Sequence, residues 1–248
     1  MHLLTKLGGS LGSGWEKKTM FKPLLMAGVA AMVTTACVQA QSGPTTTFDG
    51  IAGSRDVDTD GNVVMNGAVV SLSGRVGGDV EMNGASVDVD AEVGGDLEAN
   101  GGAVEIRGSV DGESLVNGGA VSLRGDYTGS VVANGGAVDF RGTFADGFLI
   151  NAGVFEFSGE ASAPVNVAGS GRERSMFGRS RGDRSEIEIN GTLGAGGQLC
   201  AHEVKFGSGA QLGGPLTVIA DEEPRYASGF DSSLVTYRRR EGQRCDEV

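Results

Sequence analysis

Histidine, cysteine and lysine are scarce in this chain. Its 248 residues include two His and three Cys, and beyond Ala40 the only His is His202 and the only Lys is Lys205. A multi-His zinc site and a facial iron triad are therefore excluded. A Ser-His-Asp triad would need His202, and no Gly-x-Ser-x-Gly turn adjoins that residue. The sequence predicts a protein that is not an enzyme and carries no metal or cofactor.

Helical periodicity and long apolar runs are also missing beyond Ala40. No window there repeats apolar residues at the spacing of an amphipathic helix, and no run is long enough for a membrane span. The chain instead contains 44 Gly, which fall at regular positions rather than in a linker. This composition favours neither a helical domain nor disorder.

Asparagine recurs at a fixed spacing of 17 residues. The six positions are Asn66, Asn83, Asn100, Asn117, Asn134 and Asn151. A short fixed period indicates one small unit that is built repeatedly, each copy lying on the last. The unit is too short for a helix pair or a propeller blade, whereas it suits one coil of a β-solenoid.

Within each repeat, apolar and polar residues alternate. In the third repeat Val104 and Ile106 flank Glu105, and the other repeats follow the same order. Alternation with a period of two is typical of strands, and the recurring Gly residues mark corners. We therefore expect an all-β fold, a single-stranded parallel β-helix (β-solenoid) of 17-residue coils that lie about 4.8 Å apart.

Two columns of polar residues run along this expected stack. The asparagines either form a hydrogen-bonded ladder or serve only as corner formers. Arg107, Arg124 and Arg141 form the second column, whose mutual repulsion Glu105 and Asp139 would offset. An Arg stripe that binds an anionic polymer is the alternative. Gly-Gly-Asp at 77–79 and 94–96 is similar to calcium-binding nonapeptides, but the period differs.

The solenoid is predicted to span 62–220, with a basic loop inserted at 170–185. The loop carries Arg172, Arg174, Arg179, Arg181 and Arg184. Two further coils, each with one or two extra residues, are expected after the loop. Residues 41–61 would form an N-terminal cap or linker, and 221–248 a C-terminal cap and loose tail.

The N-terminal residues 1–40 have the pattern of a leader. Met20, which we predict to be the true start in place of Met1, precedes Lys22 and a short apolar run, and small residues ending at Ala40 suit cleavage of a secretory signal. Lipidation at Cys37 is the alternative. Both routes predict an exported protein, in the periplasm or at the outer membrane or cell surface.

Export bears on the two cysteines that remain, Cys200 and Cys245. An oxidising compartment permits a disulfide between them. By closing the loop between the two residues, this bond would raise the free energy of unfolding by about 3–4 kcal/mol. Two idle thiols are the other possibility. The mature chain would hold 16 basic and 31 acidic residues, so nucleic acid is not an expected partner.

The phrases GRVGGDVEMNG, AEVGGDLEANG and GAQLGGPLTV resemble repeats of the bactofilins, a family of polymer-forming bacterial cytoskeletal proteins. The resemblance covers roughly 62–220. It implies a right-handed parallel β-helix, filaments formed end to end without nucleotide, and a role in organising the cell envelope. Export, the shorter repeat, the Arg-rich loop and the long tail depart from that family.

A solenoid ends in unpaired strand edges, which must be capped or joined. Joined ends give an open filament, so the first expectation is an envelope scaffold that self-associates head to tail. One end surface is predicted at Val204, Phe206, Leu212, Leu216 and Val218. The alternatives are a binding module whose Arg-rich loop contacts an anionic cell-wall glycan or membrane lipid, and a polysaccharide-active enzyme.

Overall fold

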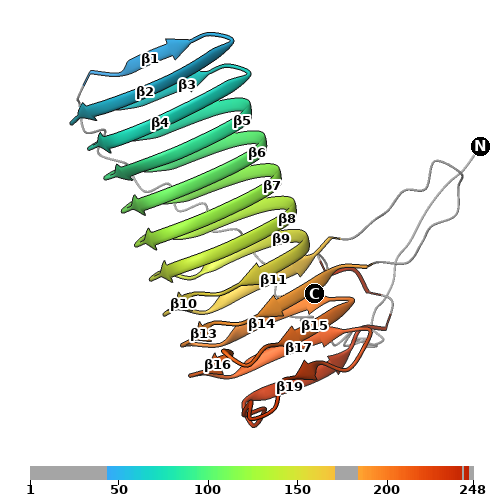
Figure 1. Ribbon diagram of the computed structural model, residues 1–248. Helices are drawn as coiled ribbons and strands as arrows, with labels where there is room; N and C mark the ends of the chain where they lie inside the picture. Colours follow the sequence, from blue (N-terminus) through green and yellow to red (C-terminus); the bar gives the residue numbers. More distant parts are fainter. Residues whose placement is uncertain (1–43, 171–183, 242, 246–248) are drawn as a thin grey trace, which may run out of the picture. The chain divides into compact units, whose positions relative to one another are not determined.

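The computed structural model describes residues 44–170, 184–241 and 243–245, all within the larger of two units, Gln41–Val248. Nineteen strands form one sheet with parallel pairing throughout, and none of the described residues is in an α-helix. The sheet winds into about eleven coils that lie one above another (Figure 1). The predicted all-β parallel solenoid is therefore confirmed. Within the same residues, no helix is long and apolar enough to cross a membrane.

Each complete coil contributes to three ladders of paired strands. The first ladder contains β1 (Thr46–Asp49), β3 (Val63–Asn66), β5 (Val80–Val93), β6 (Leu97–Val110), β7 (Ser114–Tyr127), β8 (Val131–Phe144), β9 (Phe148–Phe157), β11 (Val165–Gly169), β14 (Gly197–Ala201), β17 (Leu216–Ala220) and β19 (Val235–Arg239). The second contains β2 (Ala52–Thr59), β4 (Val69–Val76), the later parts of β5 to β9, β12 (Glu186–Ile189), β15 (Glu203–Phe206) and β18 (Arg225–Tyr226). The third contains the last residues of the long strands, then β10 (Glu160–Ala161), β13 (Thr192–Leu193) and β16 (Gln211–Leu212).

The register of the ladders follows the period of the sequence. From Val63 to Val167, first-ladder partners are 17 residues apart. Phe155 then pairs with Ile187, because the segment around 170–185 is inserted between consecutive coils. Later coils are slightly longer, so that Leu199 pairs with a residue 19 positions on. Equivalent residues consequently form straight columns along the axis.

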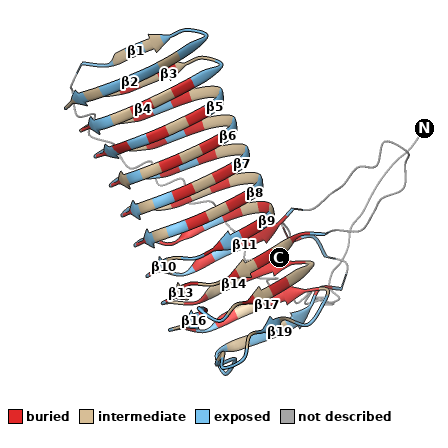
Figure 2. Cartoon of the chain, viewed as in Figure 1, coloured by how far each residue is buried: buried red, intermediate tan, exposed pale blue. Residues whose placement is uncertain are grey.

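The core consists of the inward columns of the three ladders, seen as buried bands in Figure 2. Its middle is aromatic: Tyr127, Phe140, Phe144, Phe148, Phe155 and Phe157 are all buried. Phe140 is fully buried, with its ring centroid 4.9 Å from that of Phe144 and 5.4 Å from that of Phe148. Large rings here fill the interior that aliphatic side chains such as Leu72 and Ile106 fill in earlier coils.

Glycine is required at the corner between the second and third ladders. Gly125 has a φ of 138°, in the region that favours glycine. A Cβ added there would lie 1.7 Å from the carbonyl oxygen of Gly108 in the preceding coil. Close stacking of backbone on backbone therefore explains the Gly at this position of the repeat.

The stack extends beyond 62–220 at both ends. Residues 46–59 form β1 and β2, which pair along their whole length with β3 and β4. After Ala220, β18 pairs with β15 and β19 pairs with β17. The segments predicted as caps thus contain strands that continue the ladders in register.

Candidate functional site

The six repeat asparagines form one hydrogen-bonded column in the first ladder. Each side-chain amide donates to the side-chain oxygen of the preceding coil, and the first donates to Asp49. The six N···O distances run from 2.8 to 3.1 Å. A chain of aligned amides of this kind polarises its members cooperatively, as in the Asn ladders of stacked β-structures. The column therefore fixes register along the axis.

Replacing Asn117 with Ala is expected to lower the free energy of unfolding by about 1–2 kcal/mol. The change removes a 2.8 Å bond to Asn100 and a 2.8 Å bond from Asn134, leaving both neighbours without one partner. Urea unfolding followed by circular dichroism measures the loss. Thr128→Ala, at an exposed position of the same coil, is the control and should change little. Equal effects of the two substitutions would contradict a stabilising ladder.

The Gly-Gly-Asp motifs form a second set of bonds between coils. Asp79 Oδ1 accepts the backbone N–H of Asp96 at 3.0 Å, and Asp96 Oδ1 accepts that of Glu113 at 2.8 Å. A Cβ on Gly95 would lie 2.3 Å from Asp79 Oδ1, which explains the Gly before the Asp. Among the described residues, no three His, Cys, Asp or Glu are grouped so as to hold a metal ion. These aspartates close corners.

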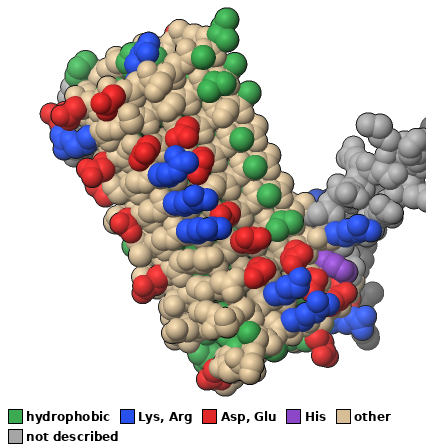
Figure 3. All heavy atoms as spheres, viewed as in Figure 1, with side chains coloured by type: hydrophobic (Ala, Val, Ile, Leu, Met, Phe, Trp, Pro, Cys, Tyr) green, Lys and Arg blue, Asp and Glu red, His purple; other side chains and the backbone are tan. Residues whose placement is uncertain are grey.

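The Arg column lies on the second ladder and is accompanied by carboxylates. Arg107 reaches Glu105 at 2.6 Å and Asp88 at 3.3 Å, and Arg141 reaches Asp139 at 3.0 Å. The hydrogen bond and charge of Asp139 raise the pKa of Arg141 above its ordinary value. Figure 3 shows basic side chains following one another along this face with acidic ones beside them. Because the acids offset the arginines, the face is not a stripe of one sign.

The other predicted anion site and the predicted lipidation site fall largely outside the described residues. Outside the described residues lie four arginines of the basic loop, Arg172, Arg174, Arg179 and Arg181, and also Cys37. Arg184 is described and is exposed at the end of the loop. Contact of the loop with a glycan or lipid stays a prediction.

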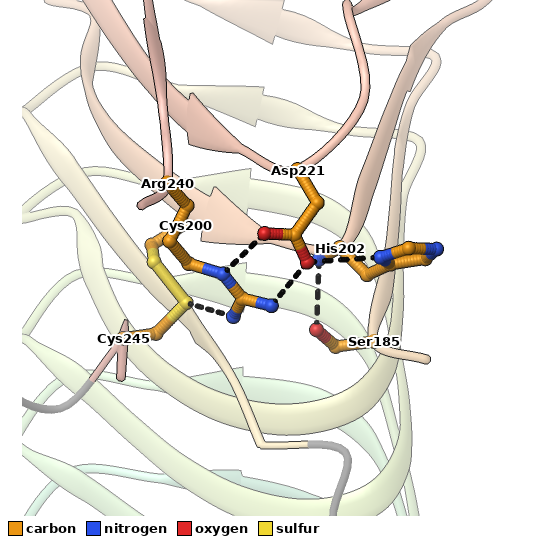
Figure 4. Close-up of a disulfide and its surroundings, with 6 residues drawn as sticks. All are labelled: Ser185, Cys200, His202, Asp221, Arg240 and Cys245. Carbon is orange, nitrogen blue, oxygen red and sulfur yellow. Dashed lines mark hydrogen bonds and ion pairs between the residues drawn. A yellow bond between two sulfur atoms is a disulfide. The ribbon is translucent and has the colours of Figure 1, made fainter. Parts of the chain in front are cut away.

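The C-terminal residues fold back over the first ladder, where the Asn column ends. Cys200 in β14 forms a disulfide with Cys245, and both are buried beside Ala168 and Ile219 (Figure 4). Ala168, Cys200 and Ile219 occupy the column position that Asn holds in earlier coils. The change from amide to apolar side chains marks the part of the column that Cys245 covers.

A partly buried ion pair lies next to the disulfide. Arg240 Nε donates to Asp221 Oδ1 at 3.1 Å, and Arg240 Nη1 lies 3.3 Å from Cys245 Sγ. Asp221 Oδ2 is also 2.9 Å from His202 Nδ1. Arg240 follows β19 directly, so this cluster holds the end of β19 to the preceding coil.

His202 contacts Ser185 through its backbone and Asp221 through its imidazole. The Ser185 hydroxyl accepts a hydrogen bond from the backbone N–H of His202 at 3.0 Å, while the imidazole points away from it toward Asp221 (Figure 4). Cys200, two residues before His202, is held in the disulfide and is not a thiolate ligand. The arrangement is suited to positioning the C-terminal segment.

Acid is expected to weaken this C-terminal closure. Burial alone would raise the pKa of Asp221, but the hydrogen bonds and charges of Arg240 and His202 outweigh it and lower that pKa. A carboxylate of this kind contributes stability above its unfolded pKa of about 3.9 and loses it as the pH falls through the lower folded value. The measurement is the difference in unfolding free energy between wild type and Asp221→Asn, which should shrink between pH 7 and pH 3. A difference that stays constant would contradict the role of the carboxylate.

The predicted end surface is wrong for four of its five residues. Val204, Phe206, Leu216 and Val218 are buried, because β18 and β19 add strands over β15 and β17. Phe206 also stacks on Tyr226 and Phe230, with ring centroids 5.4 and 4.8 Å away. Leu212, in the last strand of the third ladder, remains half-buried.

The ends of the stack therefore lie at β1 and β2, and at β18 and β19. No described strand pairs with the outer edge of β1, β2 or β19. The first coil exposes 86% of Ile51 and leaves Phe48 half-buried. The other end exposes 40% of Tyr226 and 39% of Leu234. Open backbone edges with apolar side chains beside them occur at both ends of the described stack.

Comparisons with protein-family models, curated proteins and solved structures find no match to this chain.

Proposed function

We propose that this protein is a non-enzymatic structural rod that associates end to end and serves as a scaffold in the bacterial cell envelope. The observation that carries the proposal is the pair of open ends just described. An unpaired parallel edge leaves N–H and C=O groups without partners, and joining it to another edge satisfies them. The sides of the described stack carry polar columns that already bond between coils, such as the Asn column, together with exposed apolar residues such as Val69 and Leu115.

The proposed place in the envelope follows from the leader. A secretory signal that ends at Ala40, or lipidation at Cys37, would bring the rod to the periplasm or the outer membrane. The resemblance of the repeats to bactofilins, which form filaments without nucleotide, supports the same kind of role. The disulfide between Cys200 and Cys245 is consistent with an oxidising compartment.

The purified, oxidised chain of residues 41–248 tests the self-association. We expect sedimentation velocity to show species that lengthen with protein concentration, and negative-stain microscopy to show rods joined at their ends. A single monomeric species at all concentrations would overturn the proposal. Cell fractionation of the full-length chain and mass spectrometry of its mature N-terminus test the location, since recovery in the cytoplasm with an intact leader would contradict the envelope role.

A further inference from the structure

Each ladder column has one residue at its first coil and another at its last. If a second copy continues the stack, the last residue of every column faces the first residue of the same column in the next copy. We propose, on the basis of the self-association proposed above, that copies join head to tail with β19 of one paired in parallel with β1 of the next. The register is that of the first ladder, with Tyr237 opposite Phe48 and Arg238 opposite Asp49.

The Asn column has opposite charges at its two ends. It begins with Asp49 and ends with Arg238, through Asn66, Asn83, Asn100, Asn117, Asn134, Asn151, Ala168, Cys200 and Ile219. Asn66 donates to Oδ1 of Asp49 at 3.0 Å, which leaves Oδ2 for another donor. Arg238 is exposed and forms no ion pair with any other described residue. The junction would place the guanidinium beside the carboxylate.

The inward column next to it ends in aromatic rings. It begins with Phe48 and ends with Tyr237, and both side chains are half-buried. Every intervening coil covers its inward residue with the residue of the next coil. Stacking of Tyr237 on Phe48 would bury the exposed parts of both rings, and aromatic pairs at strand spacing add to the gain from burial.

The inward column of the second ladder has a cation at one end and an aromatic ring at the other. Arg55 occupies the position that Leu72 holds in the following coil, and Tyr226 occupies the position after Phe206. The guanidinium of Arg55 already lies 4.7 Å from the ring centroid of Phe48. No described strand continues the second ladder beyond β18, and 40% of Tyr226 stays exposed although Phe206 and Phe230 stack on it. In the junction, the long side chain of Arg55 would move from Phe48, which Tyr237 then covers, to the exposed part of the Tyr226 ring.

Charge favours head to tail over the two symmetric arrangements. A junction of two heads brings together the carboxylates of Asp49, Asp56 and Asp58, and a junction of two tails brings together Arg238 and Arg239. Like charges directly opposite one another are destabilising. A head-to-tail junction alone pairs each end with its opposite and keeps the strands parallel, as they are throughout the described stack.

Charge reversal tests this junction in the oxidised chain of residues 41–248. Asp49→Arg and Arg238→Asp should each raise the concentration needed for assembly by about tenfold or more, because each puts like charges at the junction. Mixing the two single variants should restore assembly, since the two kinds of junction between them each pair Asp with Arg. The double variant should also assemble. Head-to-head and tail-to-tail contacts predict a different pattern: neither single reversal weakens assembly, because like charges already face each other there, and mixing strengthens assembly beyond wild type.

Controls separate the junction from folding and from general charge. Asp49→Asn keeps an oxygen for Asn66 and reports loss of the charge alone, and circular dichroism and thermal unfolding check that each variant is folded. Arg239→Asp changes the same charge one residue away, opposite Gly50 in this register, and should have the smaller effect. If wild type assembles and the single reversals leave that assembly unchanged, the junction is overturned but the self-association is not. The same holds if mixing the two variants does not restore assembly. A wild type that stays monomeric would overturn both.

Discussion

Replacing Phe140 with Ala is expected to lower the free energy of unfolding by about 3–5 kcal/mol. The side chain is fully buried, and its ring touches those of Phe144, Phe148 and Phe155 at centroid distances of 4.9 to 5.5 Å. Loss of the ring removes buried apolar area and leaves a cavity, since the stacked backbones on either side are held by their ladder bonds. Urea unfolding followed by far-ultraviolet circular dichroism measures the loss.

Phe140→Leu is the matched control. The preceding coil has Leu123 at the same column position, so a Leu side chain already fits the stack there. The cost of this change is expected to stay below about 1.5 kcal/mol, because most of the volume is kept. The idea of an aromatic centre that stabilises the rod fails if Ala and Leu at this position are equally tolerated.

The repeated part of the fold is predictable because its information is local. A residue of one coil contacts its equivalent 17 positions away, so the same side chain recurs wherever the same surroundings recur. Asn83 and Asn100 illustrate this: the column is legible in the sequence, and its hydrogen bonds follow from strand spacing. The solenoid class and its period need no more than this regularity.

The C-terminal end is less predictable because it departs from the repeat. β18 and β19 are separated from β17 by charged and irregular residues, and only Tyr226, Val235 and Tyr237 provide their apolar contacts. Such sparse residues show no clear alternation, so the sequence predicted a cap and a tail. The signal that was available is the Asn column itself, which changes to Ala168, Cys200 and Ile219 where another segment covers it.

The hydrogen bonds that Asp79 and Asp96 accept at the corners were not predicted, for a different reason. Asp79 and Asp96 stand after paired glycines, a pattern that sequence alone relates equally to calcium loops and to turns. The choice depends on where each carboxylate points, and that is set by the coil above it. In the structure each accepts a backbone N–H of the next coil, which no local pattern specifies.

Loss of the disulfide is expected to loosen the C-terminal end while the middle of the rod stays folded. In the variant with both Cys200→Ala and Cys245→Ala, the closure of the loop between these residues, worth about 3–4 kcal/mol, is removed. Each coil of a solenoid contacts only its neighbours, so the loss should remain near that end. β19 would then be held by its pairing with β17 and by the bond of Arg240 to Asp221.

Hydrogen exchange resolved by peptide distinguishes this local loss from a general one. Protection of β18 and β19 should fall by about two to three orders of magnitude, and protection of β6 and β7 should not change. Wild type treated with a dithiol reductant under unfolding conditions and then refolded should match the double variant. Because β19 supplies one face of the proposed junction, the double variant should also assemble less well than wild type. Unchanged protection in β19 would show that the strand pairing and the Asp221–Arg240 pair are sufficient to hold this end without the covalent link.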